Sequence, residues 1–407
     1  MQDHAQMFNR PFDSLEEFVD TISECLQCPV TLEDANHYLL AYSSHDDQTD
    51  AARIATIIGR RVPEKVINRF WKEGVIPALN QSNEPVIISE MTEIGLGRRV
   101  AVSIRKNEEV LGYIWVSESG RTLSKDELEL LKTAASKAKN ELLQLNMQRK
   151  RKERNYQNVL WQLMTGDVHD YTEMKQDLQA IGMHPQMGFS VMIMRFPKLS
   201  ETLYRQITYA AKTSQKITLF ITAQDGDQII FLTGLPAKDK GSQQALTAFS
   251  STLQAQIAER FSIIPAALGW GSVYHDYDYI KKSYEEAQKV IQLKQAFPKE
   301  TEGLLFFHEL GVLRYVEFFQ RHKAAAAVGK HPALAILQHY DKRHRTELFA
   351  TLRAFLLTDG NMNEAASLLH VHVNTLNYRL KRIKELTEID LKNPIQKLGL
   401  YFDLLLD

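Results

Sequence analysis

The sequence predicts a multidomain α+β protein. At 407 residues, the chain is long enough for two to four domains. Short apolar runs typical of strands alternate with helical patterns in residues 14–145 and again in residues 165–310, whereas residues 346–406 show helical patterns only. We therefore expect two α/β modules connected by a long helix, followed by an all-α module.

Composition excludes several classes of protein. The formal net charge is -1, so any affinity for DNA must come from a local basic patch. No run of 18 apolar residues occurs, and the amino-terminal MQDHAQMFNRPFD lacks the basic and apolar blocks of a secretory signal. Cys25 and Cys28 form a lone CxxC, whereas a zinc site needs four ligands. We expect a cytoplasmic protein with two reduced cysteines, no metal and no cofactor.

Residues 1–123 are predicted to form the first module. A helix from Ser14 to about Leu26 precedes two β-prone runs that an Asp-Ala-Asn turn separates, and a helical region then extends from Asp50 to Trp71. Three further strand patterns follow, in EPVIIS, RRVAVSIRK and EVLGYIWVSE. This order of helix, hairpin, helices and antiparallel strands resembles a GAF domain. The resemblance implies that a small molecule binds between the sheet and the helices.

Several arginines of this module are candidates for binding an anionic or amino-acid ligand. They are Arg53, Arg60, Arg61, Arg98 and Arg99. Most of them are expected to lie on the surface, and the sequence assigns no pocket to them.

A long helix is predicted over residues 124–164. Its apolar residues recur at alternating spacings of three and four, as do the a and d positions of a coiled coil. These seam residues are Leu128, Leu131, Ala135, Ala138, Leu142 and Leu145. They predict a homodimer or higher homo-oligomer, with packing against the module's own sheet as the alternative. The RKRKER run at residues 149–154 predicts a solvated hinge, with contact to DNA as the alternative.

Residues 165–330 are predicted to form a second α/β module. Apolar runs at GFSVMIMRF, KITLFIT, DQIIFLTG and PAALGWGSV alternate with helical patterns at residues 171–181, 199–213, 242–261 and 276–295. The alternation predicts an α/β sandwich whose helices cover a mixed sheet. The Gly269-Trp270-Gly271 run is interpreted as a bend at a strand edge.

A helix-turn-helix is predicted in the last module, residues 331–407. Asn361 caps the first helix of the motif, and Glu364 at the third position completes a capping box. Ala365 and Ala366 allow a second helix to cross closely, while Leu368 and Leu369 are expected to face the core. After a break at residues 370–372, the second helix carries a buried stripe. The stripe consists of Leu376, Leu380, Ile383 and Leu386.

The opposite face of the second helix predicts DNA binding. Four cations and no acid occur between Asn374 and Lys384. Cations contact phosphates or guanine, Asn can bind adenine and Thr can contact a thymine methyl group. The predicted DNA-binding residues are Asn374, Thr375, Asn377, Tyr378, Arg379, Lys381 and Arg382. The alternative is an ordinary amphipathic helix with a solvated basic face.

The stretch from Thr346 to Leu406 resembles the carboxy-terminal domain of PucR/CdaR-type bacterial transcriptional regulators. The matching positions are Thr351, Leu352, His372, Asn374, Thr375, Leu376, Tyr378, Arg379, Leu380, Arg382, Ile383, Glu385, Leu386, Thr387, Asp390, Leu391 and Pro394. Some members carry Gly where this chain has His370. A histidine there would strain the turn if a positive φ is required. Many carry Arg in place of Val373, so one phosphate contact is missing here.

The same resemblance implies that residues 165–330 form a degenerate GGDEF-like domain. A cyclase of that fold needs carboxylates to hold divalent metal beside the triphosphate. The first strand here ends in Met194-Arg195-Phe196, and the hairpin at residues 224–228 keeps only an Asp-Gly turn. No P-loop, GxSxG or HExxH occurs either. We therefore expect no enzyme, and a signalling protein of the diguanylate cyclase-like class is the alternative.

These observations together predict a ligand-responsive transcriptional regulator. It is expected to activate a catabolic operon for amino acids or purines by binding a double-stranded DNA operator. Within the family, the chain resembles the activators of proline utilisation or of alanine dehydrogenase, which implies a small-molecule effector such as proline or alanine. An interaction scaffold that does not bind DNA is the remaining alternative.

Overall fold

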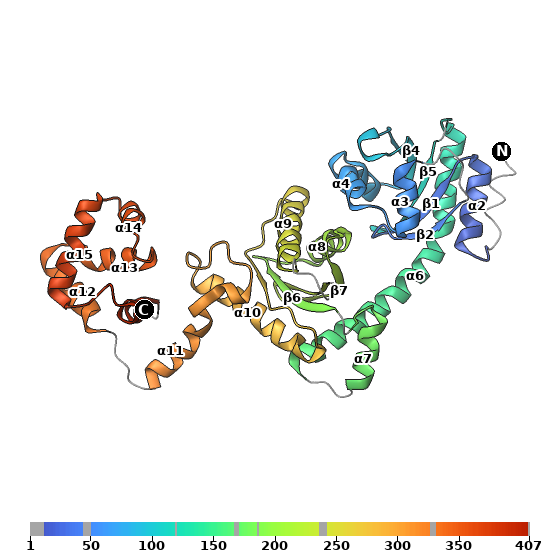
Figure 1. Cartoon of the computed structure of the whole chain (residues 1–407). Helices are drawn as coiled ribbons and strands as arrows, with labels where there is room; N and C mark the ends of the chain where they lie inside the picture. Colours follow the sequence, from blue (N-terminus) through green and yellow to red (C-terminus); the bar gives the residue numbers. More distant parts are fainter. Residues whose placement is uncertain are drawn as a thin grey trace. The chain divides into compact units, whose positions relative to one another are not determined.

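The computed structural model describes residues 12–43, 50–118, 120–166, 171–184, 187–235, 242–325 and 331–405. The chain divides into two compact units, Met1–Glu309 and Leu310–Asp407 (Figure 1). The first unit contains an amino-terminal domain, a middle domain and a long helix that belongs to both. No helix in the described ranges has the length and apolar character needed to cross a membrane.

The amino-terminal domain is a five-stranded antiparallel sheet between two helical layers. Its strands are β1 (Val30–Asp34), β2 (Leu39–Tyr42), β3 (Val86–Ile88), β4 (Arg99–Lys106) and β5 (Glu109–Ser117), in the order β2-β1-β5-β4-β3. Its helical elements are α2 (Leu15–Leu26), α3 (Ala51–Gly59), α4 (Glu64–Lys72), α5 (Val75–Gln81) and the 3-10 turn η1 (Thr92–Ile94). The order of helix, hairpin, helices and antiparallel strands is the one expected from the sequence.

Both faces of this sheet are covered, which explains why strands β4 and β5 are almost continuously buried. On one face, α2 and the first half of α6 pack on strand residues such as Val30 and Val102. On the other face, α3, α4 and α5 pack on Ala101, Tyr113 and Trp115.

Helix α6 (Lys125–Thr165) connects the two domains of the first unit without a break. Ser124 and Glu127 form a capping box at its start, and Gly166 in the left-handed conformation ends it. Its first half lies in the core of the amino-terminal domain, while Val159, Leu160 and Leu163 lie in the core of the middle domain.

The hinge predicted at residues 149–154 is wrong, because these residues are helical. Two of their charges have acidic partners on the amino-terminal domain: Arg149 pairs with Asp34, and Lys150 lies 2.5 Å from Glu109. A charged run therefore continues the helix here, since packed segments on both sides hold it in place.

The middle domain has the βαββαβ arrangement of a ferredoxin-like fold. Its strands are β6 (Gly188–Arg195), β7 (Thr218–Asp225), β8 (Gln228–Leu235) and β9 (Ala267–Trp270), in the order β7-β8-β6-β9. All neighbouring strands are antiparallel, so the predicted mixed sheet is wrong. The parallel strands β6 and β7 are separated by β8, which the sequence pattern could not reveal.

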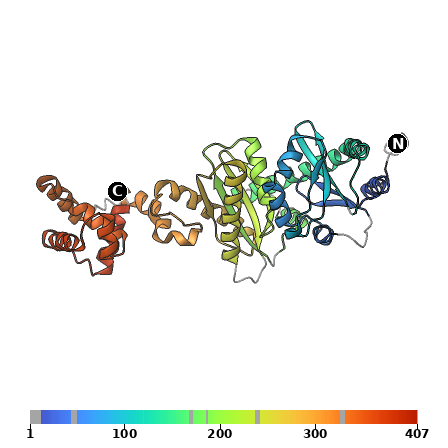
Figure 2. The same ribbon diagram turned by 90° about the horizontal axis from the view of Figure 1, so that it is seen from above.

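The helices of this domain form two layers that can be followed in Figures 1 and 2. Helices α8 (Glu201–Thr213) and α9 (Ser242–Phe261) cover one face. The end of α6, α7 (Tyr171–Ala180) and α10 (Ile280–Ala296) cover the other face, with the 3-10 turn η2 (Tyr277–Tyr279) before α10. The bend predicted at residues 269–271 is wrong, because Gly269 and Trp270 lie within β9. Gly271 instead allows a close approach of α10, since a Cβ atom there would lie 1.9 Å from the Ser283 carbonyl oxygen.

The second unit is helical throughout its described residues. After the 3-10 segment η3 (Phe307–Tyr315), its helices are α11 (Val316–Ala325), α12 (Pro332–His344), α13 (Leu348–Leu357), α14 (Met362–Leu368), α15 (Val373–Thr387) and α16 (Pro394–Leu405). Leu337, Leu352, Ile383 and Leu400 bring α12, α13, α15 and α16 into one core. A smaller core of Ala365, Ala366 and Leu376 lies between α14 and α15.

Candidate nucleic-acid interface and ligand cavity

Helices α14 and α15 form the predicted helix-turn-helix. Asn361 Oδ1 accepts hydrogen bonds from the backbone N–H groups of Asn363 and Glu364, at 3.1 and 3.3 Å, and so caps α14. The reciprocal half of the predicted capping box is different, because Glu364 accepts from the Asn361 side-chain amide at 2.6 Å instead of the backbone. Leu368, expected in the core, is 55% exposed, and only Leu369 of that pair packs inward.

The turn between the two helices has a residue with positive φ at the position where some family members carry glycine. His370 adopts a positive φ of 53°, in the left-handed region that favours glycine. His372 follows as the cap of α15, and its Nδ1 accepts from the Asn374 N–H at 3.2 Å. The small side chains of Ala365 and Ala366 let α15 cross closely, as predicted.

One face of α15 carries exposed polar side chains. Leu376 and Ile383 are fully buried and fix the orientation of the helix, while Tyr378 on the opposite side is 71% exposed. The exposed predicted DNA-binding residues are Asn374, Thr375, Asn377, Tyr378 and Lys381. At 100° per residue, Asn374, Asn377, Tyr378 and Lys381 share one side of the helix.

The other two predicted DNA-binding residues have partners inside the unit. Arg379 lies 3.0 Å from Glu347 and donates to Thr351 Oγ1 at 3.4 Å. Arg382 lies 2.9 Å from Glu385 and also packs on the Tyr340 ring. Both guanidinium groups therefore attach α15 to its neighbours, and both sit at the edge of the exposed face.

Several positions of the family motif have structural roles in this unit. Thr351 is fully buried, and its hydroxyl donates to the Glu347 carbonyl at 2.6 Å. Pro394 starts α16, and Asn393 Oδ1 caps that helix by accepting from Ile395 N at 2.9 Å. The motif thus specifies caps and helix contacts in addition to the exposed face.

A small polar cavity lies in the amino-terminal domain between the sheet and α3–α4. Its lining includes Thr31, Glu33, Arg53, Arg99 and Trp115. The sequence placed Arg53 and Arg99 among mainly superficial arginines, but they are only 3% and 7% exposed. The free space is about 10 Å³, room for about one water molecule.

The two buried guanidinium groups differ in their pairing. Arg99 lies 2.5 Å from Asp50, and Arg53 donates to the Ser43 carbonyl at 3.1 Å, but Arg53 Nε has no partner. Burial, and then the nearby charge of Arg99, lower the pKa of Arg53 to about 10. Burial also raises the pKa of Glu33, although His37 and Arg99 oppose that rise. Such a site favours an anion beside the arginines.

The other candidate arginines do not reach this cavity. Arg98 pairs with Glu118 at 2.5 Å, Arg61 donates to the Lys212 carbonyl, and Arg60 is exposed. The signal that separates Arg53 from them is its place within the otherwise apolar helix AARIATIIG.

The predicted dimerisation seam is largely covered by the chain itself. Leu131, Ala135, Ala138 and Leu142 are buried against the sheet of the amino-terminal domain, which was the alternative left open by the sequence. Leu128 is half-buried, and Leu145 is 39% exposed. The four buried residues are thus unavailable to a second copy, and the homo-oligomer stays a prediction.

In the middle domain, the position where a cyclase needs a carboxylate holds an ion pair. Arg195 ends β6, and its Nε lies 2.8 Å from Asp227 of the β7–β8 hairpin. Among the residues that the structure describes, no group of three or more His, Cys, Asp or Glu side chains could hold a metal ion.

Comparison with known proteins gives two family matches. Residues 348–406 match the PucR C-terminal helix-turn-helix domain, and residues 165–293 match the GGDEF-like domain. A solved structure, a regulator of polyketide synthase expression from Bifidobacterium adolescentis, is 17% identical with a TM-score of 0.30, over 61% of this chain and 95% of that one.

Two curated relatives come from Bacillus subtilis (strain 168). The DNA-binding transcriptional activator AdeR is 42% identical over 98% of this chain and 94% of its own length. The proline-responsive transcriptional activator PutR is 29% identical over 97% of each chain. Because AdeR is 42% identical over nearly the whole chain and both domain models match, the chain belongs to the PucR-type family of transcriptional regulators.

Proposed function

We propose that this protein activates transcription of a catabolic operon by binding double-stranded DNA through α15 when a small-molecule effector is present. The exposed face of α15 carries this proposal. It combines a cation, Lys381, with the amides of Asn374 and Asn377 on a helix whose other face is anchored in the core by Leu376 and Ile383. That combination suits insertion into a major groove, with phosphates contacted at the edges and bases at the centre.

DNA binding is tested by titrating labelled DNA with the wild type and with Lys381→Ala. The DNA is taken from upstream of the gene and of its neighbours. Losing one phosphate contact should weaken binding to all sequences and reduce the slope of log K against log salt by about 0.9. Lys125→Ala, which removes one exposed charge from the amino-terminal domain, is the matched control. Unchanged affinity and slope in a folded Lys381→Ala protein would contradict the assignment of α15.

The amides should contribute to specificity and not only to affinity. Asn374→Ala or Asn377→Ala should cost about 1 to 3 kcal/mol on the operator while leaving binding to unrelated DNA unchanged. The same loss on every sequence would assign these residues to the phosphate backbone instead.

The effector is proposed to be a small amino acid bound in the cavity of the amino-terminal domain. Arg53 and Arg99 would bind its carboxylate, and Glu33 would bind its ammonium group, beside the apolar side chains of Val66 and Phe70. Because the free space is about that of one water molecule, an amino acid enters only if the side chains that line the cavity move apart. The name of PutR as proline-responsive supports this class of ligand.

A thermal-shift screen of the L-amino acids tests the effector site. A ligand at about 100 times its Kd should stabilise the protein by about 2.7 kcal/mol. Arg53→Met should abolish that stabilisation, whereas Arg98→Met, at an exposed arginine of the same domain, should preserve it. A response that survives Arg53→Met would locate the effector elsewhere.

The middle domain is proposed to transmit the signal without cyclase activity. Arg195 neutralises Asp227 where a metal-binding carboxylate would be needed. Incubation with GTP and Mg²⁺ should therefore yield no cyclic dinucleotide, and a detectable product would overturn this part of the proposal.

A further inference from the structure

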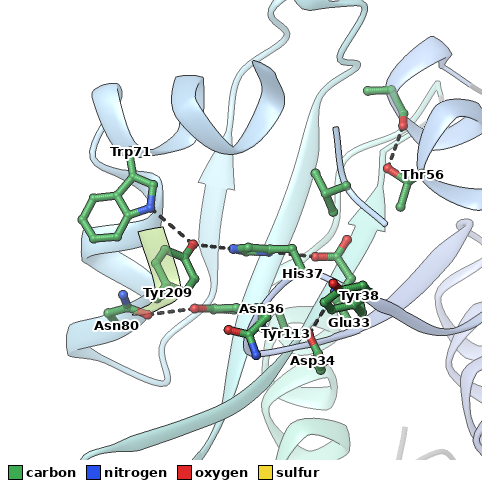
Figure 3. A network of polar contacts seen from close by, with 12 residues as sticks. Glu33, Asp34, Asn36, His37, Tyr38, Thr56, Trp71, Asn80, Tyr113 and Tyr209 are labelled. Atoms are coloured by element: carbon green, nitrogen blue, oxygen red, sulfur yellow. Dashed lines mark hydrogen bonds and ion pairs between the residues drawn. The ribbon is translucent and has the colours of Figure 1, made fainter. Parts of the chain in front are cut away.

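A chain of polar contacts extends from the effector cavity of the amino-terminal domain to helix α8 of the middle domain (Figure 3). Glu33 Oε2 lies 3.1 Å from His37 Nδ1, and His37 Nε2 lies 2.8 Å from the Tyr209 hydroxyl oxygen. Trp71 Nε1 donates to the same hydroxyl oxygen at 3.3 Å. Glu33 and His37 are buried, so water competes little for these contacts.

Counting donors and acceptors along the contacts fixes their direction. With Glu33 ionised, His37 Nδ1–H donates to Glu33, the Tyr209 hydroxyl donates to His37 Nε2, and Trp71 donates to Tyr209. If Glu33 Oε2 carried a proton, that oxygen would donate to His37 Nδ1, His37 Nε2–H would donate to Tyr209, and the Tyr209 hydroxyl hydrogen would lose this acceptor. The ionised carboxylate can only accept, so it favours the arrangement in which Tyr209 donates to His37 across the two domains.

The backbone holds His37 rigidly in this position. His37 has a positive φ of 61° in the β1–β2 turn, where Asp34 Oδ1 accepts from the backbone N–H groups of Asn36 and Tyr38. Its ring stacks on Tyr113 at 5.1 Å with an interplanar angle of 5°. A non-glycine residue kept in this backbone region by its surroundings is typical of functional sites.

We propose that the Glu33–His37–Tyr209 chain couples the effector cavity to the middle domain. A ligand ammonium group on Glu33 holds its carboxylate ionised and so stabilises the contact with Tyr209. Burial raises the pKa of Glu33, and a ligand cation beside the carboxylate opposes that rise. The proposal rests on the effector site proposed above and deepens it, since it names the path by which occupancy reaches α8.

Other contacts at this interface do not involve the cavity. Arg260 donates to Asn68 Oδ1 at 2.7 Å, and the Gln215 backbone N–H donates to Glu64 Oε2 at 3.2 Å. They hold the domains together when the hydroxyl of Tyr209 is removed. Tyr209→Phe should therefore disturb the coupling without unfolding either domain.

A double-mutant cycle in the full chain tests the coupling without a ligand. Hydrogen exchange of the α8 amides is measured in the wild type, Glu33→Gln, Tyr209→Phe and the double variant. Each single change should accelerate exchange about five-fold, and the double variant should be no faster than either one. Accelerations that multiply in the double variant would overturn the proposal.

Tyr204→Phe is the matched control, because its hydroxyl lies on the same helix but donates to Thr222 within the middle domain. Its effect should multiply with that of Glu33→Gln. Non-additivity equal to that of Tyr209→Phe would show general loosening of α8 and would also overturn the proposal.

The same exchange measurement is repeated with three kinds of added compound. They are each L-amino acid, its amide without the carboxylate, and its N-acetyl derivative without the ammonium group. A binding amino acid should slow exchange at α3 in both proteins, but at α8 only in the wild type and not in Tyr209→Phe. Equal slowing of α8 in Tyr209→Phe, or slowing by the N-acetyl derivative, would overturn the coupling while leaving the effector site intact. If no compound slows exchange at α3, the effector site and the ammonium step fail, and the double-mutant cycle still decides the contact itself.

Discussion

At the scale of single residues, His370 shows how the helix-turn-helix accommodates a departure from its family. The left-handed conformation that glycine adopts easily is imposed here on a residue with a Cβ atom. Because His370 is exposed, the cost is local and does not involve core packing.

His370→Gly should therefore raise the stability of the carboxy-terminal unit or leave it unchanged, within about 1 kcal/mol. His370→Val should lower it by about 1 to 2 kcal/mol, because a β-branched residue is disfavoured there. Thermal unfolding of the three proteins measures both effects. A stabilising Val would mean that the turn does not require a positive φ.

Glu33 gives a pH-dependent prediction at the same scale. Its pKa is raised by burial, so between the ordinary carboxyl pKa of about 4.3 and the raised value the unfolded chain releases a proton that the folded chain keeps. Ionisation of Glu33 thus costs stability as the pH rises through that window. Glutamine does not titrate and avoids this cost.

The advantage in Tm of Glu33→Gln over the wild type should accordingly be smallest below the ordinary carboxyl pKa and should grow as the pH rises. Glu16→Gln, at an exposed position of α2, serves as the control. A difference in Tm that does not vary with pH would contradict the buried, destabilised carboxylate.

At the scale of elements, helix α6 decides between two interpretations of one apolar seam. Leu131 is fully buried in the core of the amino-terminal domain. Leu131→Ala should lower the stability of the folded chain by about 2 to 5 kcal/mol and leave its oligomeric state unchanged. Dissociation of an oligomer with little loss of stability would instead restore the seam as a dimer interface.

Elements were predictable where periodicity and caps agree. The buried stripe of α15 and the limits of α9 follow from the order of residues alone, whereas the cap of α15 at His372 appears only in the structure. Strand direction in the middle domain was not predictable, because alternating apolar residues do not record which strands become neighbours.

The misjudged segments share a physical cause. Residues 149–154 have the composition of a hinge, yet their flanks are anchored in two cores that keep them helical. Arg53 and Arg99 carry charges that normally lie on the surface, and only the tertiary structure buries them beside Asp50. Leu368 is exposed because α14 packs against α15 through Ala365 and Ala366, which lie on another side of the helix.

At the scale of the whole molecule, the amino-terminal domain is proposed to bind the effector and the carboxy-terminal unit to bind DNA. Helix α6 is shared by the cores of two domains, and the Glu33–His37–Tyr209 contacts connect the cavity lining to the middle domain. Coupling of this kind requires an effector that binds one arrangement of the domains more tightly than another.

The most direct test of this claim is in vitro transcription from the neighbouring promoter with purified protein and RNA polymerase, with and without the amino acid found in the thermal-shift screen. The wild type should increase transcript yield about five-fold when the ligand is added. Arg53→Met should bind the promoter without responding to the ligand, and Lys381→Ala should bind the promoter more weakly and activate less at the same protein concentration. A transcript yield that the ligand leaves unchanged in the wild type would contradict the account.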